Sequence, residues 1–214
     1  MSKKRKQASI EDNGDRKDEV IEVSTEGNEA KKAKAQNGVF ITNIVSASKC
    51  SHPFVLQDVV FLLKGKYGDV FPAVVSMSRN TGTSFNIFRT GSIINTGSNS
   101  KARSILSMVL LESYLSRVYQ VYVRFTKWKV INIVVSMNLG VEIDMDAVNC
   151  FYSHINGPWR PDIFPGCSVK SNDLHVSFTI FKDSACNVTG LGDVEQIPLV
   201  AERAHRLFYR CRKT

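Results

Sequence analysis

Ser84-Phe85-Asn86-Ile87-Phe88 returns later in the chain, with the same alternation of polar and apolar residues, as Ser177-Phe178-Thr179-Ile180-Phe181. The offset of 93 residues also relates Phe71-Pro72 to Phe164-Pro165 and Asn95-Thr96-Gly97 to Val188-Thr189-Gly190. Asn43-Ile44-Val45 returns as Asn132-Ile133-Val134, four residues closer. One repeat with a small change of length explains every pair, and such a repeat fixes the architecture before any local assignment is made.

The repeat divides the chain into three parts. Residues 1–37 carry 17 charged side chains and few apolar ones, so we expect a disordered tail that cannot bury enough apolar area to offset its chain entropy. Residues 38–125 and 126–214 are expected to be the two repeats. Lys3-Lys4-Arg5-Lys6 in the tail is typical of a nuclear import patch, which predicts a nuclear protein.

Both repeats predict the same order of elements, namely a strand, a helix, three short strands and a closing helix. The first repeat predicts strands at 39–46, 73–77, 84–88 and 93–96, with helices at 54–63 and 100–118. The second predicts strands at 129–137, 167–170, 174–181 and 186–189, with helices at 144–152 and 195–209. Two such units can join edge to edge into one sheet that has helices on one face, which leaves the other face open.

Charge and composition narrow the class of function. The net charge is +8, and residues 38–125 hold nine basic and three acidic side chains, which indicates a polyanionic partner. The five cysteines lack paired metal-ligand spacing, and the four histidines have no counterparts in the other repeat. We therefore expect no enzyme, metal site, cofactor or small-molecule ligand. No apolar run approaches the length of a membrane span, so no membrane partner is expected.

The open face of the predicted sheet carries unusual side chains. Along a strand successive side chains point to opposite faces, so Phe85 and Ile87 share the core face, whereas Ser84, Asn86 and Phe88 share the other. Core packing does not explain a phenylalanine at the end of the polar face in both repeats. A face of apolar, hydroxyl and amide groups with few charges suits the minor groove of DNA, which offers hydrogen-bond acceptors and apolar sugar edges.

The ordered, duplicated motifs resemble the TATA-binding protein family across residues 39–212, and Phe164-Pro165-Gly166 is especially typical. The resemblance implies an α+β fold, a pseudo-twofold saddle made of a ten-stranded curved antiparallel sheet with four helices on the convex face. It also implies a general transcription initiation factor that binds A/T-rich promoter elements in the minor groove, bends the DNA and nucleates the preinitiation complex.

The resemblance assigns roles to individual residues. Four phenylalanines that wedge between base steps at the ends of a site of about eight base pairs correspond to Phe71, Phe88, Phe164 and Phe181. The minor-groove floor corresponds to Asn43, Val45, Ile94, Thr96, Asn132, Val134, Cys186 and Thr189. Residues next to the wedges are Pro72, Asn86, Pro165 and Thr179, and the family has leucine where this chain has Asn86 and Thr179.

The remaining assignments concern phosphates and protein partners. Arg79, Arg89, Lys170 and Lys182 are the phosphate-binding candidates, because several basic positions of the family carry other residues here. The surfaces that receive transcription factors IIA and IIB in the family correspond to Val109 and Leu110 and to Arg160 and Asp162. An alternative is an assembly module that kept the fold but acts mainly through protein contacts, with weak or no sequence-specific DNA binding. An unrelated hydrolase is a third and remote alternative.

Overall fold

The computed structural model describes residues 38–68 and 70–213. The predicted tail and its import patch lie outside the described residues. The first half contains β1 (Val39–Cys50), α1 (Leu56–Leu63), β2 (Lys66–Tyr67), β3 (Ala73–Ser78), β4 (Thr83–Phe88), β5 (Ser92–Ser98) and α2 (Lys101–Tyr119). The second contains β6 (Phe125–Asn138), α3 (Met145–Asn156), β7 (Cys167–Ser171), β8 (Val176–Ile180), β9 (Ala185–Leu191) and α4 (Ile197–Phe208), with short 3-10 helices at Val194–Gln196 and Tyr209–Cys211.

The strands form one antiparallel sheet in the order β2-β3-β4-β5-β1-β6-β9-β8-β7. The two halves meet where β1 pairs with β6, as the edge-to-edge joining predicts. At this seam Asn43 lies opposite Val134 and Val45 lies opposite Asn132. The two Asn-Ile-Val motifs thus face each other with their ends exchanged, which is the register that a twofold relation between the halves requires.

The predicted α+β fold class is confirmed, with an open antiparallel sheet and four α-helices. The described residues form nine strands where ten were expected. The strand without a counterpart is β2, whose equivalent at the 93-residue offset is Trp159–Arg160. Pro158 and Pro161 flank that position, and proline cannot donate to a strand ladder. The Trp159 N–H instead donates to Asn149 Oδ1 at 2.8 Å.

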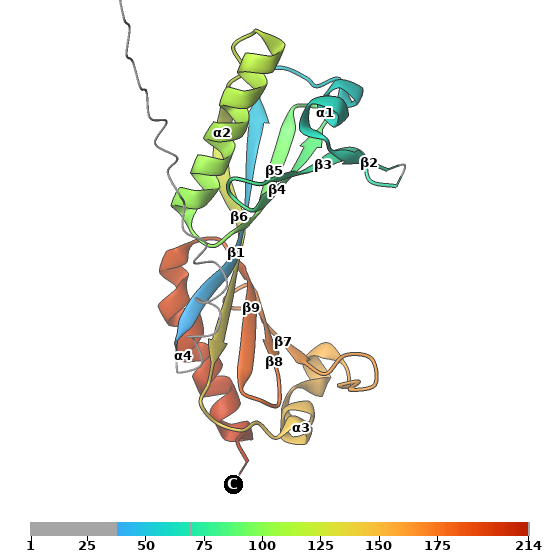
Figure 1. The fold of residues 1–214 in the computed structure, drawn as a ribbon. Coiled ribbons are helices and arrows are strands. Elements are labelled where there is room, and N and C mark those ends of the chain that lie inside the picture. The colour runs from blue at the N-terminus through green and yellow to red at the C-terminus, as the bar shows by residue number, and fades with distance from the viewer. Residues whose placement is uncertain (1–37, 69, 214) are drawn as a thin grey trace, which may run out of the picture. The chain divides into compact units, whose positions relative to one another are not determined.

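Helices cover one face of the sheet (Figure 1). α2 packs along β1 and β5, α4 packs against β9, and α1 and α3 contact the outer strands β3 and β7. Alternate residues of each strand are buried beneath the helices, as with Ile44 and Ile133, both fully buried. Their neighbours Asn43 and Asn132 are only partly exposed to solvent on the uncovered face. No helix in the described part of the chain is long and apolar enough to cross a membrane.

The layer beneath α2 differs from the layer beneath α4. In the first half it is polar and buried, with Ser46 Oγ bonded to Ser104 Oγ at 2.7 Å and Thr81 Oγ1 bonded to Ser107 Oγ at 2.8 Å. Thr83, Asn95 and Ser98 complete this polar layer. The same seven positions of the second half, in chain order, are Val135, Leu174, Val176, Val188, Leu191, Ile197 and Val200. Hydrogen bonds therefore replace apolar contacts at these positions beneath α2, while Met108, Leu111 and Leu115 pack the rest of the helix against the apolar core.

Candidate nucleic-acid interface

The uncovered face of the sheet, called the open face below, brings the predicted site residues together. Its partly exposed positions alternate with buried ones along β1, β4, β5, β6, β8 and β9. They include nearly all of the predicted floor and wedge-adjacent residues, namely Asn43, Val45, Asn86, Ile94, Thr96, Asn132, Val134, Thr179 and Thr189. The open face therefore presents amide, hydroxyl and aliphatic groups, as the alternation predicts.

The four predicted wedge phenylalanines form two matched pairs. Phe71 and Phe88 meet edge to face, with ring centroids 5.7 Å apart and an interplanar angle of 71°. Phe164 and Phe181 repeat this contact at 5.7 Å and 70°. Phe71 is 44% exposed and Phe164 is 49% exposed, and neither belongs to the apolar core of its half. Each half of the sheet thus ends in the same partly exposed aromatic pair.

Small and exposed residues surround each aromatic pair. A Cβ on Gly166 would lie 2.7 Å from the Phe164 ring and 2.8 Å from the Phe181 ring, so the absence of a side chain there gives the second pair its space. Immediately before the wedges, Val70 is 99% exposed and Ile163 is 72% exposed. These two aliphatic residues occupy equivalent places in the repeat and extend the apolar tip at each end.

The central asparagines are held in one orientation. Asn43 Oδ1 accepts a hydrogen bond from the Gly97 N–H at 2.7 Å, and Asn132 Oδ1 accepts one from the Gly190 N–H at 2.8 Å. Both glycines have positive φ, +92° and +103°, a conformation that glycine adopts without strain. Since each carbonyl oxygen is engaged, the Nδ2 amino group is the end that remains to donate.

Cross-strand pairs flank these asparagines in both halves. Ser84 lies opposite Thr96 and Ser177 lies opposite Thr189, which gives each half a pair of neighbouring hydroxyls. Further out, Asn86 lies opposite Ile94, and Thr179 lies opposite Asn187.

Cys186 does not belong to the open face, and its prediction as a floor residue is wrong. Its side chain is fully buried in the core on the helix side, where the 93-residue offset pairs it with buried Ile93. Burial raises the pKa of the Cys186 thiol to about 12. The counterpart of Ile94 on the open face is Asn187, which lies one residue further along β9 and therefore on the opposite side of the sheet.

The predicted phosphate-binding residues lie in different surroundings. Arg89 and Lys182 are exposed, immediately follow Phe88 and Phe181, and are equivalent in the repeat. Lys170 is exposed on the outer strand β7. Arg79 instead lines a cavity beside α2, on the helix side, so the structure does not bring it to the open face.

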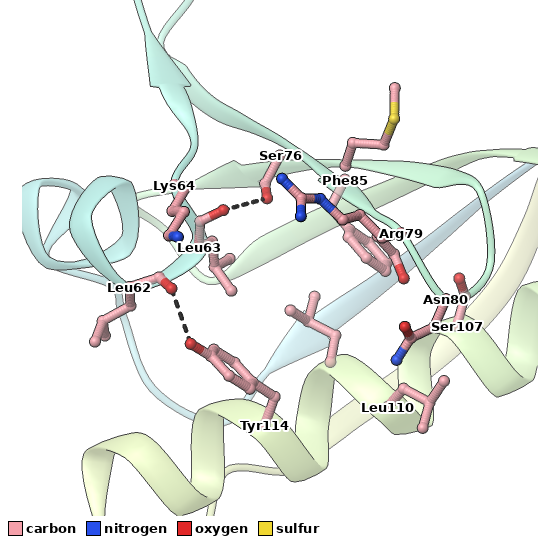
Figure 2. A pocket seen from close by; sticks show the side chains of 13 residues that line it. Leu62, Leu63, Lys64, Ser76, Arg79, Asn80, Phe85, Ser107, Leu110 and Tyr114 are labelled. Atoms are coloured by element: carbon pink, nitrogen blue, oxygen red, sulfur yellow. Dashed lines mark hydrogen bonds between the residues drawn. The ribbon is translucent and has the colours of Figure 1, made fainter. Parts of the chain in front are cut away.

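The predicted partner positions Val109 and Leu110 are exposed on α2, at 51% and 39%. Leu110 borders a cavity of about 590 Å³ between α2, the end of α1 and the turn after β3. Figure 2 shows Tyr114 and Leu110 of α2 facing Leu63 and Arg79 across this cavity, with the Tyr114 hydroxyl donating to the Leu62 carbonyl oxygen at 2.9 Å.

Arg160 and Asp162, the other predicted partner positions, form an exposed ion pair with an N–O distance of 2.8 Å. Hydrogen bonding to Arg160 lowers the pKa of the Asp162 carboxyl. The N–H groups of Ile163 and Phe164 both donate to the Arg160 carbonyl oxygen, at 3.0 and 2.9 Å. The ion pair therefore belongs to the turn that presents the second wedge.

Sequence reasoning missed several residues that shape this interface. They are Gly97, Gly190, Val70, Ile163 and Asn187. Of these, Asn187 follows from applying the 93-residue offset to the predicted floor residue Ile94, whereas the other four are recognised only in the structure. No group of three or more metal-ligating side chains comes together in residues 38–68 and 70–213.

Known proteins resemble this chain in sequence and in fold. The family model described as Transcription factor TFIID (or TATA-binding protein, TBP) matches residues 127–211. TATA-box-binding protein 2 of Methanosarcina acetivorans is 28% identical over 156 residues, which are 71% of this chain and 84% of the relative. The TATA-box-binding protein of Methanocaldococcus jannaschii is 25% identical over 157 residues, 72% of this chain and 85% of the relative.

Among solved structures, the one titled Methanococcus jannaschii TBP superposes with a TM-score of 0.67 over 80% of this chain and 98% of its own length. The sequence identity is 22%, so this match establishes the shared fold. Fold, repeat and relatives together define a transcription-factor class of protein and not an enzyme, as the sequence predicts. The family model thus matches the second repeat, and over both repeats the chain is similar in sequence and fold to TATA-binding proteins.

Proposed function

We propose that this chain is a general transcription initiation factor of the nucleus. It binds A/T-rich promoter DNA with its open face in the minor groove, inserts Phe71, Phe88, Phe164 and Phe181 between base steps, and bends the duplex. The bent complex then nucleates assembly of the preinitiation complex. The relatives' name, TATA-box-binding protein, supports the kind of target.

The chemistry of the open face supports the minor groove as the target. A·T and T·A pairs present there only the acceptors adenine N3 and thymine O2, and the fixed amino groups of Asn43 and Asn132 are donors suited to them. Val45 and Val134 offer aliphatic contacts beside these donors, across the seam between β1 and β6. Such a surface suits acceptor edges and sugar rings better than a track of phosphates.

The observation that carries the proposal is the pair of matched aromatic contacts at the two ends of the open face. Leaving four phenylalanine rings partly exposed forgoes the stabilisation that their burial would give, about 1.5–3 kcal/mol for a fully buried side chain. Insertion between base steps buries the rings and kinks the duplex at a cost of a few kcal/mol per step, as TATA-binding proteins themselves illustrate.

The proposed protein partners are transcription factors IIA and IIB or their equivalents. Their surfaces would be the exposed part of α2 around Val109 and Leu110 and the turn that carries Arg160 and Asp162.

A salt-titrated binding assay tests the DNA-binding proposal. Fluorescence anisotropy would compare an A/T-rich duplex with a random duplex of the same length between 50 and 200 mM salt. We expect tighter binding to the A/T-rich duplex at every salt concentration, and a slope set by the few basic side chains near the open face. Equal affinity for both duplexes would contradict recognition of A/T-rich DNA.

A second candidate function is that of an assembly module that acts mainly through protein contacts. It is favoured by the surface of α2, where Ile105, Leu106, Val109 and Leu110 are exposed. At the equivalent places of α4 the chain has Glu202 and Arg203 in place of Val109 and Leu110. Since the fold accepts charged residues there, the apolar stripe on α2 is not required by the fold itself.

The two candidates differ in one pair of measurements. An assembly module would bind no duplex at low salt, yet would form a stable complex with purified transcription factors IIA or IIB that Val109→Glu/Leu110→Arg abolishes. A DNA-binding factor would keep its DNA affinity in that variant, because α2 lies on the face away from the open face.

A further inference from the structure

We propose that Asn86 and Asn187 let the open face accept a G·C pair in each half of its DNA site, more readily in the half that faces β8 and β9. The inference rests on the proposed minor-groove function and names two residues that set its sequence preference. Asn86 lies on β4 and Asn187 lies on β9, so the two amides occupy positions that are not equivalent in the repeat.

The two amides lie on the open face and are available to a ligand. Asn86 lies between buried Phe85 and Ile87, and Asn187 lies between buried Cys186 and Val188. Each asparagine is itself partly exposed. Among the described residues neither carboxamide has a hydrogen-bond partner.

These amides differ from the central pair in the chemistry that they can offer. Asn43 and Asn132 use Oδ1 to accept a glycine N–H, so they present a donor alone. Asn86 and Asn187 can turn either end of the carboxamide toward DNA, because a free amide carries both an acceptor oxygen and two donor hydrogens. Of these four amides, therefore, only the outer two can present an acceptor to the groove.

Guanine places one donor in the minor groove, its N2 amino group, and no other base does so. An aliphatic carbon keeps that nitrogen about 3.5–4.0 Å away, whereas an amide oxygen accepts it at about 2.7–3.2 Å. A floor of valine, isoleucine and leucine thus excludes guanine by lack of room. An asparagine of similar size to leucine converts the same approach into a hydrogen bond.

The neighbours of the two amides make the halves unequal. Asn86 lies opposite aliphatic Ile94, while Asn187 lies opposite Thr179, whose hydroxyl is a second acceptor. A guanine amino group facing β8 and β9 therefore meets two polar side chains, and one facing β4 and β5 meets one. The difference would give the DNA site a polarity and orient the protein on it.

The experiment measures the effect of the N2 amino group alone. Fluorescence-anisotropy competition would use an A·T-rich site in which single A·T pairs are replaced by 2,6-diaminopurine·T. A second series would replace single inosine·C pairs by G·C. Within each comparison the minor grooves differ only by the amino group, so direct readout is separated from changes in the major groove.

We expect the amino group to lower affinity about tenfold at most positions. At one position in each half the loss should be less than about threefold, because one hydrogen bond of ordinary strength accounts for the difference between the two losses. The smaller loss should occur in the half that faces β8 and β9. Asn86→Leu and Asn187→Val should each restore the tenfold loss at one position only. Asn80→Leu, in the turn after β3 and away from the open face, is the matched control and should change nothing.

Two results would overturn the inference and are distinguishable. An equal loss at every position, unchanged by Asn86→Leu and Asn187→Val, would refute the role of the amides while leaving minor-groove binding intact. Failure to bind any of the duplexes would refute the proposed function, and the inference with it.

Discussion

The carboxamide oxygen of Asn43 accepts a hydrogen bond from the Gly97 N–H at 2.7 Å, and Asn132 and Gly190 repeat the bond at 2.8 Å in the other half. Each bond joins residues that are far apart in the chain. It connects the first strand of a half, β1 or β6, to the end of the last strand of that half, β5 or β9. The bond leaves the amino end of each amide as the end that can donate from the open face. A change that preserves the bond but removes the donor can therefore separate folding from DNA recognition.

Asn43→Asp/Asn132→Asp is that change. A carboxylate oxygen still accepts the glycine N–H, so we expect the midpoint of thermal unfolding to stay close to that of the unaltered chain. Affinity for A/T-rich DNA should fall at least about tenfold, because an acceptor replaces a donor opposite adenine N3 and thymine O2. Anisotropy and calorimetry provide the two readouts.

Asn149→Asp is the matched control for that pair. Its Oδ1 also accepts a backbone N–H, that of Trp159 at 2.8 Å, but it lies on α3. Unaltered DNA affinity in Asn43→Asp/Asn132→Asp, or an equal loss in Asn149→Asp, would contradict the donor role.

Arg89→Ala/Lys182→Ala tests the phosphate contacts next to the wedges. If both side chains contact phosphates, the slope of log affinity against log salt should become shallower by about 1.8, that is, about 0.9 for each contact. The preference for A/T-rich over random DNA should remain. Arg206→Ala is the control, since it removes an exposed α4 side chain that pairs with Glu202 at an N–O distance of 2.5 Å, and it should leave the slope unchanged. If Arg206→Ala shifted the slope as much as the double variant does, a local phosphate role for Arg89 and Lys182 would be ruled out.

Ser107→Val tests the buried polar layer beneath α2. The substitution removes the shared partner of the Thr81 and Thr83 hydroxyls, which keep only their bond to each other, so unfolding free energy should fall by about 1 kcal/mol. Thr81→Leu/Thr83→Val/Ser107→Val introduces the second half's residues and should recover most of the loss, because no buried hydroxyl of the cluster is left unpaired. Urea unfolding measures both. A triple variant less stable than Ser107→Val would show that these hydrogen bonds cannot be exchanged for apolar packing.

Thiol labelling tests the location of Cys186. Burial raises its pKa to about 12, so it stays protonated between pH 7 and pH 9, and the thiol is not the reactive form. Iodoacetamide followed by mass spectrometry should modify exposed Cys150 in the folded protein and Cys186 only after unfolding. Rapid labelling of Cys186 in the folded protein, suppressed by added DNA, would contradict its burial and show that its side chain lies on the open face.

Much of the fold could be predicted from the sequence because the repeat supplied each strand twice. The faces of β4 and β8 followed from alternation, and the edge-to-edge joining of the halves followed from the order of elements in the repeat. The loss of a strand beside Pro158 and Pro161 required reading proline as a missing donor. The two prolines are visible in the sequence, but only the pairing of the other strands in the structure shows that a strand is missing there.

The site was predicted less evenly, for identifiable physical reasons. Cys186 was assigned by resemblance, although the constant offset assigns Asn187, since one residue along a strand reverses the face. The glycine bonds that fix Asn43 and Asn132 join distant segments, so no local pattern announces them. The polar layer beneath α2 likewise depends on Ser46, Thr81 and Ser104 meeting in space.

The most direct test of the central claim is a measurement of DNA bending. Fluorescence resonance energy transfer between dyes at the ends of an A/T-rich duplex would be followed as protein is added, first with the unaltered chain and then with Phe164→Ala/Phe181→Ala. Phe61→Ala, which removes an 84% exposed phenylalanine on α1, is the control. We predict that the unaltered chain and the control raise transfer alike, whereas the double variant, at saturating protein, loses much of the bend. Equal transfer in all three proteins would contradict insertion of the second aromatic pair and, with it, the proposed way in which the open face engages DNA.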